Sequence, residues 1–370
     1  MADVNMLVSA LTDVGLVRTT NEDGYAVTDL ASGELIAVDA ADRAVDVQDR
    51  GVLLALSDGM GGHQAGEIAS ALVLESLQAA LQQDTKGHIH EQLEHAVLRA
   101  NQTVLNAART DNRHGMGATL TAVFVRGAEA YIAEVGDSRA YLLRNGRLRQ
   151  ITRDQSLVQL MVDHGVMSPE EAKHSASKNV ILQAMGLAED VRVAIARLEL
   201  RRGDRVLLCS DGVTNEVEDD ELKEIMTGSE PRAACDAMIA LANERGGRDN
   251  STAIVADLRG DGLEPPDEFE TVTSTYEVLQ AFESRLGGAP PDEPPGAPPT
   301  AAAVPDLPAD PDAATGPAPA AKPAASLASS TTAGAGETQK LARVTGPSWR
   351  TVAIVAVVLI VILIVLVVSG

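Results

Sequence analysis

The sequence predicts an α+β fold for residues 1–258, and two observations lead to that class. Short apolar, β-branched runs bounded by glycine or aspartate indicate strands, and these runs follow one another in groups. Strict alternation of strands with helices would instead be typical of a doubly wound parallel sheet. A third observation sets the limit of this domain, because all but Pro169 and Pro231 of the 17 prolines lie after Arg259.

The individual elements are expected in blocks along this first part of the chain. Apolar runs predict strands at residues 51–56, 118–125, 130–135, 205–209 and 251–256. Apolar residues at three- and four-residue spacing among good helix formers predict amphipathic helices at residues 65–81, 90–108 and 232–243.

Residues 259–347 change to proline, alanine, glycine, serine, threonine and acid, a composition that cannot bury enough apolar surface to offset its chain entropy. We expect this part to be a disordered acidic linker. Within it, residues 269–286 carry Val278, Leu279, Phe282 and Leu286 at helical spacing. That spacing leaves open either a docking helix or a transient helix without a role, and the second reading is favoured.

Residues 348–370 are expected to be a transmembrane anchor. The stretch 351–368 has no charge and is long enough, at about 1.5 Å per residue, to cross a hydrocarbon core of roughly 30 Å. Lys340, Arg343 and Arg350 precede it, so the positive-inside tendency predicts a single-pass protein of the cell inner membrane with a cytoplasmic catalytic domain. The N-terminus does not have the pattern of a cleaved export signal.

Charge and cysteine content exclude several classes. The formal net charge of −23 argues against a nucleic-acid partner, because such a chain repels phosphate backbones. Cys209 and Cys235 are far apart and in no metal-binding spacing, so neither a disulfide framework nor a structural zinc site is expected.

Aspartates beside apolar runs are the informative pattern. Asp58, Asp137 and Asp211 each follow such a run, and Asp249 stands just before one. Each alone is more often part of a turn. Together they predict carboxylates that converge on one point, where cations are needed to offset their repulsion.

Oxygen-only ligands favour hard divalent ions such as Mn²⁺ or Mg²⁺. Two such ions suit hydrolysis of a phosphate ester. Residues 13–23 add Arg18, a residue type suited to bidentate phosphate binding, and further acid in Glu22 and Asp23.

Six motifs occur in a specific order: DVGLVRTTNED (13–23), SDGMGG (57–62), GATL (117–120), GDSR (136–139), CSDGV (209–213) and GRDNST (247–252). Together they resemble the metal-dependent Ser/Thr protein phosphatases of type 2C (the PPM family) in their bacterial form. The resemblance covers residues 7–257. It implies a four-layer α-β-β-α sandwich of two antiparallel sheets, with metals at one end.

The resemblance also implies roles for individual residues. Asp58 would bridge two core metals, with the Gly59 carbonyl, Asp211 and Asp249 as further ligands. Glu22 and Asp23 would hold metal-bound waters, Arg18 would bind the phosphate, and Asp137 would bind a third ion. We therefore expect a phosphatase in which water, prepared by Mn²⁺ or Mg²⁺, attacks phosphoserine or phosphothreonine.

Two departures from the family pattern matter. Eukaryotic members carry a histidine directly after the Asp-Gly, whereas this chain has Met60, with His63 three residues later. The proton donor is therefore unassigned, with water favoured over His63. In residues 155–186, which match a mobile flap beside the cleft, Gln183 stands where relatives commonly have arginine, so substrate choice is expected to differ.

Three functions remain open at this point. An active phosphatase would oppose a cytoplasmic or membrane Ser/Thr kinase and act on phosphorylated proteins, including such kinases. A phosphoprotein-binding scaffold and a phosphatase for small metabolites are the alternatives. Thr271, Thr273 and Thr275 lie among acidic residues, and a phosphothreonine reader docking there is weighed against a plain solvated linker.

Overall fold

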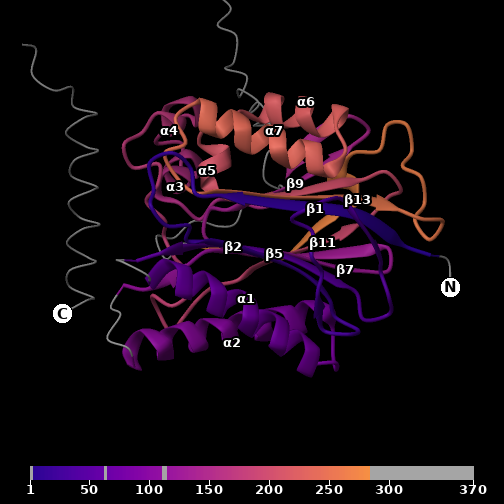
Figure 1. Cartoon of the computed structure of the whole chain (residues 1–370), viewed down its shortest axis with the longest axis horizontal. Helices are drawn as coiled ribbons and strands as arrows, with labels where there is room; N and C mark the ends of the chain where they lie inside the picture. The colour runs from indigo at the N-terminus through magenta and orange to yellow at the C-terminus, as the bar shows by residue number, and fades with distance from the viewer. Residues whose placement is uncertain (1–2, 62–64, 111–114, 284–370) are drawn as a thin grey trace, which may run out of the picture. The chain divides into compact units, whose positions relative to one another are not determined.

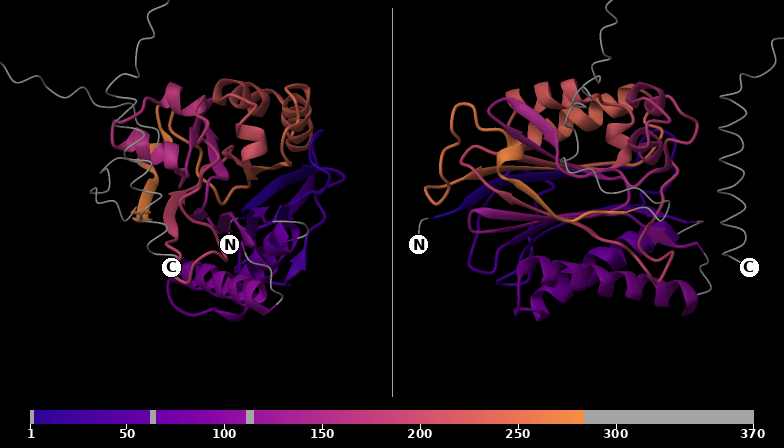
Figure 2. Two further views of the ribbon diagram at one scale, coloured as in Figure 1. Left: turned by 90° about the vertical axis from the view of Figure 1, so that its left-hand side faces the viewer. Right: turned by 180° about the vertical axis from the view of Figure 1, so that it is seen from behind.

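A computed structural model of the chain describes residues 3–61, 65–110 and 115–283. Figure 1 shows two stacked β-sheets with helices on both outer faces, and the view from behind in Figure 2 shows the same layers. The α+β class and the expected sandwich of two antiparallel sheets are confirmed for this part of the chain.

One sheet has six strands in the order β10-β9-β12-β13-β1-β4, and its strand pairs are antiparallel. Its strands are β1 (Asn5–Asp13), β4 (Arg43–Asp46), β9 (Arg139–Arg144), β10 (Arg147–Gln150), β12 (Arg205–Cys209) and β13 (Ser251–Arg259).

The other sheet has the order β14-β11-β8-β7-β5-β2-β3, and β6 pairs with β5 beside this path. Its pairs are also antiparallel. The strands are β2 (Asp23–Asp29), β3 (Glu34–Leu35), β5 (Val52–Met60), β6 (Gly117–Ala118), β7 (Leu120–Arg126), β8 (Glu129–Val135), β11 (Ala194–Glu199) and β14 (Tyr276–Gln280).

Helices cover the outer face of each sheet and one end of the sandwich. Helices α1 (Ala65–Gln83) and α2 (Ile89–Thr110) lie under the second sheet, and α6 (Asp219–Gly228) and α7 (Pro231–Glu244) lie over the first (Figure 1). The short helices α3 (Leu157–Asp163), α4 (Pro169–Lys173) and α5 (Asp211–Thr214) gather at one end.

Strand β5 shows why the inner strands are apolar throughout. Side chains alternate between the faces of a strand. Leu53 and Ala55 pack in the cluster formed with α1 and α2, whereas Leu54 and Leu56 pack in the cluster between the sheets. Because both faces are buried, the strand reads as a continuous apolar run.

The three expected helices correspond to α1, α2 and α7, and the five expected strands to β5, the β6–β7 pair, β8, β12 and β13. One detail differs. Asp58 was expected at the end of its strand, but β5 continues to Met60 because Gly59 and Met60 pair with β6.

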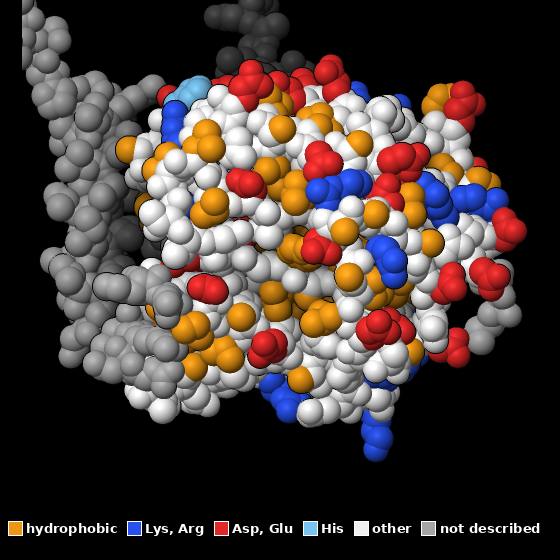
Figure 3. All heavy atoms as spheres, in the orientation of Figure 1, with side chains coloured by type: hydrophobic (Ala, Val, Ile, Leu, Met, Phe, Trp, Pro, Cys, Tyr) orange, Lys and Arg blue, Asp and Glu red, His pale blue; other side chains and the backbone are white. Residues whose placement is uncertain are grey.

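Charged side chains are distributed over the surface. On the face drawn in Figure 3, Asp and Glu are interspersed with Lys and Arg and with apolar groups. The net negative charge of the chain is therefore not gathered into one patch on this face.

The folded part continues beyond the boundary expected at Arg259. Residues 261–283, which we call the strap, include β14, which pairs with β11 at the edge of the second sheet. Residues 272–274 form a 3₁₀ turn rather than the start of a docking helix. The helix expectation was wrong because strand pairing and burial of Val272, 4% exposed, outweigh a weak helical pattern.

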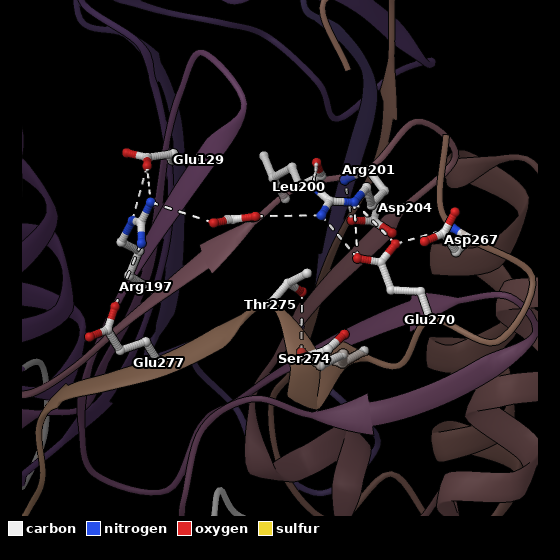
Figure 4. A network of polar contacts seen from close by, with 12 residues as sticks. Glu129, Arg197, Leu200, Arg201, Asp204, Asp267, Glu270, Ser274, Thr275 and Glu277 are labelled. Atoms are coloured by element: carbon white, nitrogen blue, oxygen red, sulfur yellow. Dashed lines mark hydrogen bonds and ion pairs between the residues drawn. The ribbon is translucent and has the colours of Figure 1, made fainter. Parts of the chain in front are cut away.

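Polar contacts fasten the strap as well. Glu270 forms an ion pair with Arg201, and Arg197 lies between Glu129 and Glu277 of β14 (Figure 4). Arg144, 2% exposed, donates to both Asp204 oxygens at 2.7 and 2.6 Å and to the Thr275 hydroxyl at 2.6 Å. A buried arginine needs such partners, so the strap completes the environment of this guanidinium.

Within residues 3–61, 65–110 and 115–283, no helix is both long and apolar enough to cross a bilayer. The rest of the expected linker, residues 284–347, and the expected anchor, residues 348–370, lie outside the described residues.

Candidate active site

Two of the expected site residues lie side by side on neighbouring strands. Asp23 begins β2 and is the register partner of Asp58 in β5. Directly opposed carboxylates are unfavourable in a sheet unless something else stabilises them. Their placement therefore indicates a functional rather than a structural role.

Asp211, the first residue of α5, lies just after β12 of the other sheet and joins this pair. Its carboxyl group is within hydrogen-bonding reach of that of Asp58, and its Oδ2 accepts from Asn215 at 3.0 Å. Asp23 Oδ2 accepts from the hydroxyls of Ser210 and Thr252, each at 2.7 Å. The Oδ1 atoms of Asp23 and Asp211 are buried without a hydrogen-bond partner.

The shared environment raises the pKa of these carboxyls. Removal from water is the largest cause, followed for Asp58 by the charges of Asp23 and Asp211. The pKa of Asp23 rises to about 7 and that of Asp211 to about 6, and the pKa of Asp58 lies well above its usual value. These groups therefore compete for protons near neutral pH.

Close backbone packing at the site requires glycine at two positions. A Cβ on Gly59 would lie 2.1 Å from the Gly66 carbonyl oxygen, and one on Gly212 would lie 1.9 Å from that of Asn250. The glycine after each aspartate therefore allows the start of α1 and the loop before β13 to approach the carboxylates.

Arg18 and Asp249 meet at the rim of the site. Arg18 Nη2 donates to Asp249 Oδ2 at 2.7 Å, and the arginine side chain is 49% exposed. The structure therefore pairs the expected phosphate-binding group with an expected metal ligand. Glu22 follows in the same loop, and its pKa is raised mainly by burial.

Asn250 is a functional residue that the sequence reasoning missed. Its Nδ2 donates to the carbonyl oxygens of Val14 and Thr20 at 3.0 Å, and its Oδ1 accepts from the Glu22 amide at 2.8 Å. It therefore fixes the loop that carries Arg18 and Glu22. Its place inside the GRDNST motif was the available signal.

Asp137 lies in the turn after β8. The preceding Gly136 has φ 114, and a Cβ there would lie 2.7 Å from the Thr119 side chain. Burial is the first cause that raises the pKa of Asp137, and the Asp211 charge is the second. The structure thus brings Asp137 into electrostatic range of the other carboxylates.

The donor set fits a hard cation, because every donor is oxygen and two buried carboxylate oxygens are unpartnered. A divalent ion among these carboxylates would offset their repulsion. Over the described ranges, however, no group of three or more His, Cys, Asp or Glu side chains has the arrangement of a metal site. The ligand roles of Asp58, Gly59, Asp211, Asp249, Asp137 and Glu22 therefore stay predictions.

Two expectations about other residues have different outcomes. His63, the candidate proton donor, lies outside the described residues. Gln183 does lie in the flap, residues 155–186, but its amide bonds to Gln155 and to the backbone of Arg192. The structure gives Gln183 partners within the chain, and the expected difference in substrate choice stays a prediction.

Comparisons with known proteins identify the family of this chain. A family model described as Protein phosphatase 2C matches residues 28–247. Protein phosphatase PhpP of Streptococcus pneumoniae is 33% identical over 263 residues, which cover 70% of this chain and 100% of PhpP. The chain belongs to the protein phosphatase 2C family.

Mycobacterial relatives extend the comparison. Serine/threonine protein phosphatase PstP of Mycobacterium tuberculosis is 38% identical over 261 residues, or 70% of this chain. The match spans only 46% of the length of PstP. The crystal structure of the PstP catalytic domain in complex with two manganese ions is 36% identical, with a TM-score of 0.58, over 69% of this chain and 99% of that one.

The raised carboxyl pKa values predict how stability depends on pH. Between about pH 4 and 7 the folded protein without metal holds more protons than the unfolded chain, so its free energy of unfolding falls as the pH rises. We expect a decrease on the order of 4 kcal/mol from pH 5 to 8, since the pKa of Asp23 is about 7 and that of Asp211 about 6, measured by urea unfolding of the full chain in chelator. Asp211→Asn should flatten this slope, whereas Asp49→Asn, at an exposed loop position, should not. Stability that rises over this range in the wild type would contradict the assignment.

Proposed function

We propose that this protein is a metal-dependent Ser/Thr protein phosphatase that hydrolyses phosphoserine and phosphothreonine. The observation that carries the proposal is the convergence of Asp23, Asp58 and Asp211 from both sheets, with unpartnered carboxylate oxygens, close to Arg18. Membership of the protein phosphatase 2C family supports it.

The residues that would hold the metals are those named by the sequence motifs. Asp58, the Gly59 carbonyl, Asp211 and Asp249 would hold two core ions, with Glu22 and Asp23 at their periphery and Asp137 at a third. When bound, Mn²⁺ or Mg²⁺ supplies an activated water and neutralises charge on the phosphoryl group. The manganese in the related PstP structure supports this choice of metal.

The chain's own residues position the substrate. Arg18 is half exposed at the rim, where its guanidinium can bind two phosphoryl oxygens. Asp249 holds it at 2.7 Å, which fixes its orientation before the substrate arrives. The Asn250 contacts keep this loop in place. Water is proposed as the proton donor for the leaving alkoxide.

Hydrolysis of a phosphothreonine peptide by the full chain tests the activity. We expect turnover with Mn²⁺ or Mg²⁺, none with chelator, and a loss of roughly 100-fold or more in kcat/KM for Asp211→Asn. Asp49→Asn serves as the control. A folded, metal-loaded wild type without turnover would instead favour the phosphoprotein-binding scaffold.

We also propose that residues 348–370 anchor the protein in the cell inner membrane, with the catalytic domain in the cytoplasm. The uncharged stretch 351–368 and the basic residues before it support this proposal. Phosphoproteins near that membrane, including Ser/Thr kinases, would then be the substrates. After cell fractionation and a carbonate wash, the full chain should stay with the membranes, and a chain ending at residue 347 should be released. Retention of the shortened chain would contradict the anchor.

The strap bears on the proposed docking of a phosphothreonine reader. Thr271 and Thr273 are exposed, whereas the Thr275 hydroxyl is held by Arg144 at 2.6 Å. We therefore place the reader's target at Thr271 or Thr273. Phosphopeptide mass spectrometry from cells with an active Ser/Thr kinase should find phosphate there, and its absence from well-covered strap peptides would contradict the proposal.

A further inference from the structure

The two ends of the flap are joined by a pair of glutamine side chains. Gln155 lies where the chain enters the flap and is 1% exposed, and Gln183 lies where it returns. Gln183 Nε2 donates to Gln155 Oε1 at 2.7 Å. The backbone closes the same point, because the Leu182 amide donates to the Gln155 carbonyl at 2.7 Å.

Gln155 holds the turn that carries Asp137. The Gln155 side-chain Oε1 accepts from the Gly136 backbone amide at 2.8 Å. The backbone amide of Gln155 donates to the Gly136 carbonyl at 2.8 Å. Its Nε2 donates to the Glu134 carbonyl at 3.1 Å. A single carbonyl oxygen of Gln155 therefore serves both Gly136, next to Asp137, and Gln183 of the flap.

The Asp137 turn is in turn connected to the strand that carries Asp58. Thr119 Oγ1 accepts from the Asp58 amide at 2.9 Å and shares a hydrogen bond of 2.9 Å with Ser138 Oγ. Movement of this turn would therefore shift Asp137 and, through Thr119, the strand that carries Asp58.

The segment after Gln183, where the chain leaves the flap, is also held by backbone hydrogen bonds to β6. The amides and carbonyls of Met185 and Ala118 exchange hydrogen bonds of 2.8 and 3.0 Å, and Ala118 pairs with Gly59. Gln183 thus lies between two connections to the carboxylate site. Its remaining contacts, to the Arg192 amide at 3.1 Å and carbonyl at 2.6 Å, keep its side chain turned toward the protein.

We propose that Gln183 is a positioning residue that sets the flap and the Asp137 turn relative to each other through Gln155. The proposal rests on the proposed phosphatase function. Both polar groups of the Gln183 side-chain amide bond within the chain, which supports a positioning role. The expected difference in substrate choice stays a prediction. The arrangement couples the position of the flap to the site that Asp137 would provide for a metal ion.

Two substitutions in the full chain test this link. Gln183→Met keeps the length of the side chain without its hydrogen bonds, and Gln183→Glu keeps an acceptor for the Arg192 amide but removes the donor to Gln155. Gln159→Ala is the matched control, because Gln159 lies in the flap helix α3 and donates to Asp163 of the same helix. Urea midpoints establish that each variant is folded.

Both Gln183 variants should accelerate hydrogen exchange at the Gly136 amide and raise the Mn²⁺ concentration for half-maximal activity by roughly 10-fold. The KM for a phosphothreonine peptide should also rise in both Gln183 variants. Their kcat at saturating Mn²⁺ and peptide should change less than about twofold. The control should leave all four quantities unchanged.

Unchanged Gly136 exchange would overturn the proposal, and so would faster exchange with wild-type Mn²⁺ dependence and KM. If the wild type hydrolyses no phosphopeptide, the proposed function fails separately. Calorimetric titration of Mn²⁺ then tests the positioning role of Gln183. The proposal is supported if both Gln183 variants bind Mn²⁺ more weakly than the wild type and show faster hydrogen exchange at the Gly136 amide. It is contradicted if either property matches the wild type.

Discussion

The mutual repulsion of carboxylates at one end of the sandwich is the constraint on which the rest of the structure depends. Asp23 and Asp58 are register partners on neighbouring strands. Asp211, at the start of α5 just after β12 of the other sheet, is within hydrogen-bonding reach of Asp58. Such a group is costly to bury, as the raised pKa values show. A stable framework surrounds these carboxylates, and bound cations would offset their repulsion.

The framework consists of three apolar clusters, one between the sheets and one beneath each helical layer. Antiparallel strands from both sheets end near the same point, so residues far apart in sequence meet there. Glycines at 59 and 212 allow the backbones to approach, and Asn250 ties the loop of Arg18 to them. Side chains at rigid strand ends, held by hydrogen bonds such as those of Asn250, are suited to positioning a phosphoryl group.

Much of this could be predicted from the sequence, and the exceptions share a physical reason. The helix α1 and strand β12 follow from local periodicity, and the site aspartates from motifs beside apolar runs. The strap could not be predicted, because β14 gains its stability from pairing with β11, about 80 positions earlier in the chain. The contacts of Gln183 and Asn250 were likewise not predicted, since they join segments that are distant in the sequence.

The central claim is that these carboxylates form one metal-binding, proton-sharing group. Calorimetric titration of Mn²⁺ into the full chain at pH 6.5, in buffers with different ionisation enthalpies, tests it most directly. The account predicts that binding releases protons, because burial raises the pKa of Asp23 to about 7 and, together with the neighbouring carboxylates, raises that of Asp58 well above its usual value. The observed enthalpy should therefore depend on the buffer. An absence of binding, or a heat independent of buffer, would contradict it.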